Sequence, residues 1–128
     1  TIAREFLDTA ASCQRKKNLS AFVDNLFSAT ELMAKAELLM IPDKAILYAK
    51  SHGVVSPKYN MWGKLGNTDQ AYVQLLNRLS SLRKPARYGP KNRLNVKPDE
   101  AATMLKTAKQ MMKRVSASVP QRVKIPPI

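Results

Sequence analysis

Between residues 18 and 40 the chain carries its longest regular pattern of apolar positions. The apolar side chains recur mostly at three- and four-residue steps: Leu19, Phe22, Val23, Leu26, Phe27, Leu32, Met33, Ala36 and Leu39. This spacing is typical of an amphipathic α-helix with a broad apolar face. No glycine or proline interrupts the segment before Pro42, where we expect the helix to end. So broad an apolar face requires further helices packed against it.

Shorter segments on both sides of this helix predict some of those partners. Residues 2–15 have an apolar side and predict a first helix, joined to the long one by a turn near residues 17–19 as an antiparallel hairpin. Residues 43–50 predict a short helix. The pair Ser56-Pro57 is typical of an N-cap followed by the first helical position, and so predicts the start of another short helix.

Two longer helices are predicted in the second half of the chain. Asn67 or Thr68 can cap the first of them, and Pro85 is expected to stop or kink it. Its apolar stripe is Tyr72, Leu75, Leu76, Leu79 and Leu82. The second begins at Pro98 and has the most regular stripe of all: Ala101, Met104, Leu105, Ala108, Met111, Met112 and Val115. Prolines from Pro120 onward predict a non-helical tail.

Together these patterns predict an all-α fold, an up-and-down antiparallel bundle of four to five main helices. We expect the bundle to occupy residues 1–119 and the proline-containing tail residues 120–128. A chain of 128 residues with only four glycines is compatible with one helical domain that buries its own core.

Composition excludes several classes of site. The single cysteine, Cys13, cannot form an intrachain disulfide, and one cysteine with one histidine cannot make an ordinary structural zinc site. We therefore expect no metal, no cofactor and a reduced, cytoplasmic location. No apolar run approaches the roughly 20 residues needed to cross a bilayer, so no membrane span is expected.

The net charge of +13 changes the functional expectation. Residues 1–40 contain equal numbers of cationic and acidic residues, so all the excess lies beyond residue 40, where the only acids are Asp43, Asp69, Asp99 and Glu100. Such asymmetry favours a polyanionic partner, either nucleic acid or an acidic protein.

Three stretches together resemble the HEPN family (higher eukaryotes and prokaryotes nucleotide-binding domain). They are residues 28–36 (SATELMAKA), residues 51–55 (SHGVV), and residues 79–89 (LSSLRKPARYG) followed by a helix rich in alanine and methionine. The third departs from the family pattern, because Arg87 stands where an aspartate is usual. The resemblance covers roughly residues 18–118 and rests on the order and spacing of the three stretches.

The resemblance implies a helical bundle that commonly forms homodimers. Many HEPN proteins are ribonucleases of toxin systems that use an arginine followed, four to six residues later, by a histidine. That motif is missing here, because the only histidine is His52 and residues 45–47 are apolar. The resemblance is therefore to the non-catalytic members, often encoded beside a nucleotidyltransferase partner, and no catalytic residue is predicted.

Residues Arg83 to Lys97 predict a basic loop that contains glycine and proline, and this loop is the main candidate for binding. It has six cations and no acid, so it can neutralise several phosphates, and its tyrosine can stack on a base. The predicted residues for nucleic-acid or nucleotide binding are Arg83, Lys84, Arg87, Tyr88, Lys91, Arg93 and His52. A solvated run of charges explains the same residues equally well.

Three functions remain open from the sequence. The first is a non-catalytic HEPN-like module that binds nucleic acid or nucleotide, as a homodimer or with a nucleotidyltransferase, in a toxin–antitoxin-like system. The second is a degenerate ribonuclease in which folding brings His52 near Arg83 or Arg87. The third is a helical interaction module whose basic face docks an acidic protein. A role at a membrane surface is weaker, because the cations are spread over loops.

Overall fold

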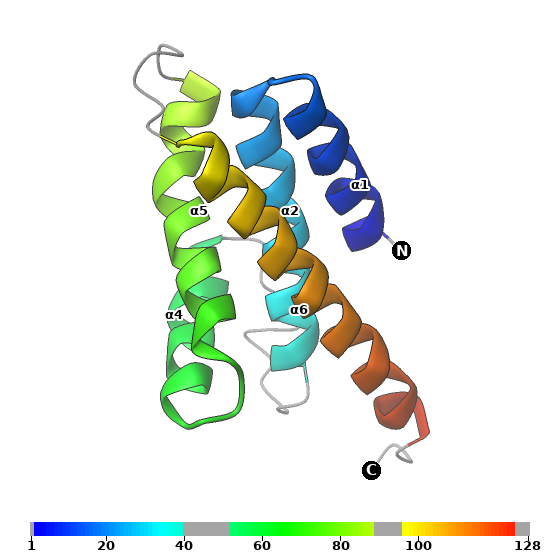
Figure 1. Ribbon diagram of the computed structural model, residues 1–128. Coiled ribbons are helices and arrows are strands. Elements are labelled where there is room, and N and C mark those ends of the chain that lie inside the picture. The colour runs from blue at the N-terminus through cyan, green and yellow to red at the C-terminus, as the bar shows by residue number, and fades with distance from the viewer. Residues whose placement is uncertain (1, 40–51, 89–95, 125–128) are drawn as a thin grey trace.

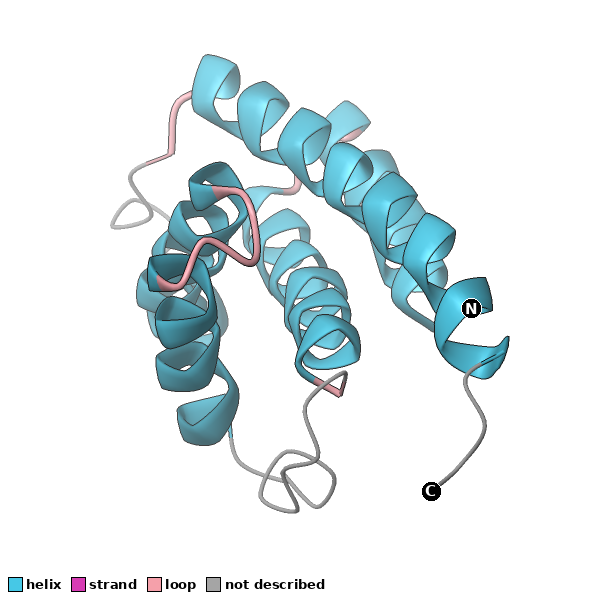
Figure 2. Cartoon of the chain, turned by 90° about the horizontal axis from the view of Figure 1, so that it is seen from below, coloured by secondary structure: helices cyan, strands magenta, loops and turns pink. Residues whose placement is uncertain are grey.

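The described part of the chain is α-helical, with short turns between helices (Figures 1 and 2). The computed structural model describes residues 2–39, 52–88 and 96–124, and the helices within them are α1 (Ile2–Arg15), α2 (Leu19–Leu38), α4 (His52–Lys64), α5 (Gln70–Tyr88) and α6 (Pro98–Lys124). No strand occurs among these residues. The predicted all-α helical bundle is thus confirmed.

Helix α2 is the one around which the others pack. It contacts α1, α4, α5 and α6, and it lies in the middle of the bundle in both views (Figures 1 and 2). Its buried apolar side chains are Phe22, Val23, Leu26, Phe27, Ala29, Met33, Ala34 and Leu38. Two residues expected on the apolar face, Leu32 and Leu39, are instead exposed, whereas Thr30 and Glu37 are buried. A helix with neighbours on nearly every side does not follow a one-face pattern.

The other helical stripes agree closely with the sequence. Helix α1 occupies the predicted residues and turns back into α2 through residues 16–18. Every apolar residue predicted for the stripes of α5 and α6 is buried. The short helix predicted for residues 43–50 lies outside the described residues.

Three predictions that relied on prolines are wrong. Helix α4 begins at His52, so Ser56 is not an N-cap and Pro57 lies inside the helix. Helix α5 continues through Pro85, so the expected stop at this residue is wrong, and α6 continues through Pro120 to Lys124, so the start of the expected tail is helical. A proline inside a helix removes one hydrogen bond at a cost of about 3 kcal/mol. Buried side chains on either side of Pro57, those of Val55 and Tyr59, offset that cost in α4.

Helices α4 and α5 approach closely and are joined by polar side chains. A β-carbon placed on Gly63 would lie 2.6 Å from Val73 Cγ2, so only glycine fits this contact without rearrangement. The amides of Asn60 and Asn77 donate to each other at 3.1 and 2.8 Å. Helix α5 is capped by Asp69, whose Oδ1 accepts from the Ala71 N–H at 2.8 Å, rather than by the predicted asparagine or threonine.

A buried carboxylate ties three helices together. Tyr59 of α4 donates to Glu37 Oε2 of α2 at 2.5 Å, and the Tyr59 hydroxyl lies 3.1 Å from Thr68 Oγ1. Arg114 of α6 places Nε 3.7 Å from Glu37 Oε1 and donates to the Asn67 carbonyl at 2.7 Å. We call Glu37, Tyr59, Thr68 and Arg114 the Glu37 cluster. Because Glu37 and Tyr59 are buried, their hydrogen bond is retained in a medium of low dielectric.

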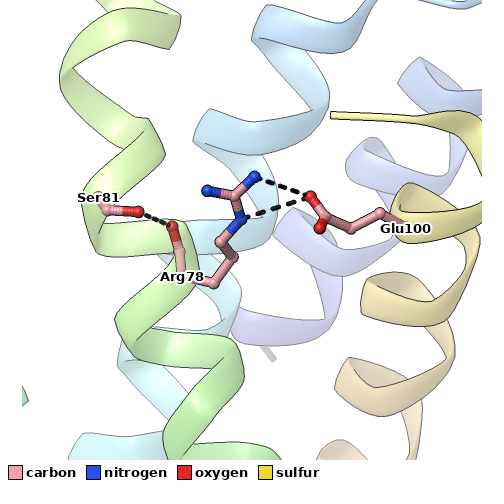
Figure 3. A network of polar contacts seen from close by, with 3 residues as sticks. All are labelled: Arg78, Ser81 and Glu100. Carbon is pink, nitrogen blue, oxygen red and sulfur yellow. Dashed lines mark hydrogen bonds and ion pairs between the residues drawn. The ribbon is translucent and has the colours of Figure 1, made fainter. Parts of the chain in front are cut away.

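An ion pair at the surface of the protein joins α5 to α6 (Figure 3). Arg78 donates to Glu100 Oε1 through Nε at 3.3 Å and Nη2 at 3.0 Å, and Ser81 donates to the Arg78 carbonyl. Both charged side chains are about two-fifths exposed. Exposed pairs of this kind contribute roughly 0–1 kcal/mol, so this ion pair sets the register of the two helices more than it stabilises them.

The turn between α1 and α2 contains a strained lysine. Lys17 has φ of 58°, a left-handed conformation that favours glycine. Its N–H bonds to the Gln14 carbonyl at 3.0 Å, and the Asn18 N–H bonds to the Cys13 carbonyl at 2.9 Å. These two bonds define a Schellman motif, whose left-handed position is usually glycine. Asn18 then caps α2 by accepting from the Ala21 N–H.

Replacing Tyr59 by phenylalanine tests the Glu37 cluster. Burial, followed by the hydrogen bond to Glu37, raises the pKa of Tyr59 above its ordinary value of 10.0. The native state therefore keeps a proton that the unfolded chain loses above about pH 10, and the free energy of unfolding should fall as pH rises beyond that point. We expect Tyr59→Phe to lower stability at neutral pH by about 1–3 kcal/mol and to weaken this alkaline dependence.

Denaturant unfolding at several pH values measures both effects. Tyr72→Phe is the matched control, because it removes a hydroxyl from a second buried tyrosine outside the cluster. Equal alkaline slopes for the wild type and Tyr59→Phe would contradict the assignment.

Replacing Lys17 by glycine tests the strained turn. The left-handed conformation costs a non-glycine residue about 1–2 kcal/mol, whereas the added backbone freedom of glycine costs about 0.5–1 kcal/mol. We expect Lys17→Gly to raise the free energy of unfolding by up to about 1 kcal/mol in denaturant titrations. Lys16→Gly, whose residue has negative φ, should lower it. A destabilised Lys17→Gly protein would show that the lysine side chain itself holds the turn.

Candidate nucleic-acid interface

Two of the predicted binding residues lie on α5 with their side chains described. Arg83 is partly buried, and its guanidinium carbon lies 5.0 Å from the ring centroid of Phe27 in α2. Its Nε is buried without a hydrogen-bond partner among the described residues. Lys84 is exposed. Arg83 is thus anchored on α2 by a cation–π contact, while Lys84 extends into solvent.

The structure does not describe the side chains of the remaining predicted binding residues. Arg87 and Tyr88 form the end of α5 and His52 the start of α4, but their side chains lie outside the described part of the structure, as do Lys91 and Arg93 altogether. The predicted basic loop is wrong for its first six residues, 83–88, which are helical. A helix here fixes Arg83 and Lys84 on a rigid support.

Folding adds cations that the linear sequence did not associate with this segment. The C-terminal ends of α1 and α5 and the N-terminal ends of α2 and α6 meet at one end of the bundle, at the top of Figure 1. The segments that meet there carry six cations: Arg15, Lys16 and Lys17 at and just after the end of α1, Arg83 and Lys84 in the last two turns of α5, and Lys97 just before α6. We call these six residues the basic end. In the sequence the first three are balanced by distant acids, one of which, Glu37, is buried elsewhere.

Few acids oppose these cations. The first turn of α6 brings Asp99 and Glu100 to the same end, where they favour helix initiation. Glu100 is already paired with Arg78, which is not part of the basic end. Asp99 is exposed and is the nearest acid along the chain to Lys97. Asp24, in the second turn of α2, is a third acid near this end, so six cations are opposed by three acids and the local balance is positive, which favours phosphate binding.

A cavity of about 420 Å³ opens within the basic end, and we call it the α1–α6 cavity. Its apolar lining comes from the start of α2 and the start of α6: Leu19, Phe22, Val96 and Ala101. Arg15 and Lys17 line it at the end of α1, together with Gln14 and the free thiol of Cys13. An apolar wall with a few charged and polar groups is the usual composition of a small-molecule site.

A separate row of cations lies along the exposed side of α6. Lys106, Lys109 and Lys113 recur at helical spacing and are all exposed, so they share one outward face. They lie roughly 12–22 Å along the helix from its first residue. This row was not predicted, although its three- and four-residue spacing is visible in the sequence.

Other kinds of site are not found among the described residues. No group of three or more histidine, cysteine or acidic side chains there is placed to hold a metal ion. None of the helices in residues 2–39, 52–88 and 96–124 is long and apolar enough to span a bilayer.

Comparison with known proteins supports one relationship. No curated protein and no solved structure matches the chain. The family model described as HEPN domain matches residues 1–118, which is nearly the whole bundle. This match agrees with the all-helical fold and with the resemblance noted in the sequence, and it associates the chain with nucleotide-binding or RNase-type modules. The chain belongs to the HEPN family.

Proposed function

We propose that this protein is a non-catalytic HEPN module that binds nucleic acid through the basic end. The single observation that carries the proposal is that the end of α1, where Arg15, Lys16 and Lys17 follow one another, lies at the same end of the bundle as the cationic end of α5 and the start of α6 (Figure 1). Each lysine or arginine that meets a phosphate releases a counterion, so six cations at one end of the bundle supply substantial binding energy at low salt.

Rigid placement of the cations supports binding rather than mere solubility. Arg83 is held against Phe27, and Lys17 occupies a left-handed position that glycine would occupy at lower cost. Strained backbone at an exposed cation is typical of a functional surface. Arg87, Tyr88, Lys91, Arg93 and His52 belong to the same proposal on the evidence of the sequence, since α5 leads directly from Lys84 to the first two of them.

The absence of catalysis is the second part of the proposal. The sequence has one histidine, His52, and apolar residues at positions 45–47, so it lacks the arginine–histidine spacing of the family's ribonucleases. The proposal also includes a homodimer, a nucleotidyltransferase partner and a toxin–antitoxin-like role, which rest on the family resemblance. It further includes a cytoplasmic location, which rests on the single cysteine. Docking of an acidic protein is the competing function.

The salt dependence of RNA binding tests the basic end. For single strands the slope of log K against log salt is about −0.7 per phosphate neutralised, so a variant lacking Lys16, Lys84 and Lys97 (each to Ala) should bind short single-stranded RNA with a slope shallower by about 2. All three side chains are exposed, so the fold should be unaffected. Fluorescence anisotropy at several salt concentrations measures the slope.

The control variant removes the same charge from another surface. Lys106, Lys109 and Lys113, each changed to Ala, also lower the net charge by three, yet they lie on the outer face of α6. This variant should keep most of the wild-type slope. Equal losses in the two variants would assign binding to net charge alone, and no RNA binding at low salt would favour the acidic-protein function.

The non-catalytic assignment is tested with the same RNA. We expect the purified protein to leave labelled single-stranded RNA intact over hours, because no residue pair of the ribonuclease type is present in the sequence. Gel analysis of the RNA gives the result, with His52→Ala run in parallel to identify contaminating nuclease. Cleavage by the wild type that disappears in His52→Ala would establish the degenerate-ribonuclease function instead.

A further inference from the structure

We propose that the α1–α6 cavity binds one nucleotide unit, with the base against its apolar wall and the phosphate at Arg15 and Lys17. This inference rests on the proposed function, which it refines by naming the part of the ligand that enters the protein. The shared chemistry is an unstacked base carrying a phosphate, which either a free nucleotide or a single strand can supply.

The cavity has the size and the walls for such a ligand. Its volume of about 420 Å³ falls within the range of roughly 300–1,000 Å³ typical of small-molecule sites. Of its apolar lining residues Phe22 and Ala101 are buried, whereas Leu19 is partly buried and Pro98 is exposed, so the last two present the accessible apolar surface. These apolar groups come from α2 and α6, whose positions are fixed by the core of the bundle. The apolar wall is therefore largely preformed.

The charged side of the cavity is oriented by the end of α1. Arg15 and Lys17 are exposed and supply the charged part of the cavity lining, whereas the wall described above is apolar. The carbonyls of Cys13 and Gln14, which would repel an anion, already accept hydrogen bonds from Asn18 and Lys17. Helices α2 and α6 both begin at this cavity, so the positive ends of their dipoles lie beside it.

The combination of groups favours a nucleotide over simpler anions. A bare phosphate would use the cations but leave the apolar wall exposed to water, and an apolar molecule would use only the wall. A base with an attached phosphate uses both, and the Gln14 side chain in the lining offers an amide that can donate to and accept from a base edge.

The test is calorimetric titration of the wild type with adenosine 5′-monophosphate and, separately, with a short oligoadenylate. Two variants locate the binding. Lys17→Gly removes a cation that lines the cavity and keeps the turn geometry, whereas Lys109→Ala removes an exposed cation of α6 that neither lines the cavity nor belongs to the basic end. We expect Lys17→Gly to weaken binding about tenfold, the value of one charge-assisted hydrogen bond, and Lys109→Ala to weaken it less than about twofold.

Cys13 supplies a second measurement of location. It is the only cysteine in the chain and it lines the cavity. A ligand at about ten times its dissociation constant should slow alkylation of this thiol about tenfold, and inorganic phosphate at the same ionic strength should not. Protection by the monophosphate identifies a free nucleotide, and protection by the oligoadenylate alone identifies an unstacked base of a strand.

The opposing outcomes separate this inference from the proposed function. One outcome would overturn the cavity as a nucleotide site and leave the basic end as a surface site. In that outcome the monophosphate does not bind, Cys13 is not protected, and salt-dependent RNA binding is weakened equally by Lys17→Gly and by Lys16→Ala, which removes a cation of the basic end that does not line the cavity. Equal protection by inorganic phosphate would also overturn it. Absence of any RNA binding would remove the proposed function, and this inference would fall with it unless the monophosphate still bound and protected Cys13.

Discussion

The fold depends on the burial of α2 by all four helices that contact it. Full burial of a phenylalanine, leucine, valine or methionine side chain contributes about 1.5–3 kcal/mol, and α2 supplies several such side chains over five turns. A helix so enclosed must also satisfy its polar groups internally. The Thr30 hydroxyl donates to the Leu26 carbonyl at 2.8 Å, and Glu37 receives the Tyr59 hydroxyl. These bonds allow α2 to be surrounded without leaving a buried donor or charge unpaired.

The sequence predicts the helices well because apolar periodicity and helix geometry describe the same surface. The stripe of α6 is buried at every predicted position, and α1 spans the expected residues. Three of the errors share one cause, the use of proline as a boundary. Pro57, Pro85 and Pro120 each lie inside a helix, and in α4 and α5 buried side chains near the proline, such as Tyr59 and Leu82, offset the loss of one hydrogen bond. Packing of this kind is not visible in a local pattern.

The basic end was only half predictable. Arg83 and Lys84 are conspicuous in the sequence because no acid lies near them, whereas Arg15, Lys16 and Lys17 are offset by acids in the same segment. Only the fold shows that Glu37 is buried, that the end of α1 lies beside the start of α6, and that the end of α5 lies at the same end of the bundle. Likewise, nothing in the sequence distinguished Glu37 from the partly exposed Glu31 one and a half turns earlier in α2. The balance of charges along the sequence therefore does not predict the charge of a surface when one of the balancing residues is buried in the core.

The central position of α2 also affects how the chain must be made. The hairpin of α1 and α2 closes through a three-residue turn and can form as soon as residue 39 is free, but the remaining sides of α2 are covered one after another by α4, α5 and finally α6, which reaches Val115 last. At a synthesis rate of about 5–20 residues per second the interval from residue 39 to residue 115 lasts roughly 4–15 s. Until it ends, the nascent chain presents part of the apolar surface of α2 to solvent, and surface of this kind makes an unfinished chain prone to aggregation.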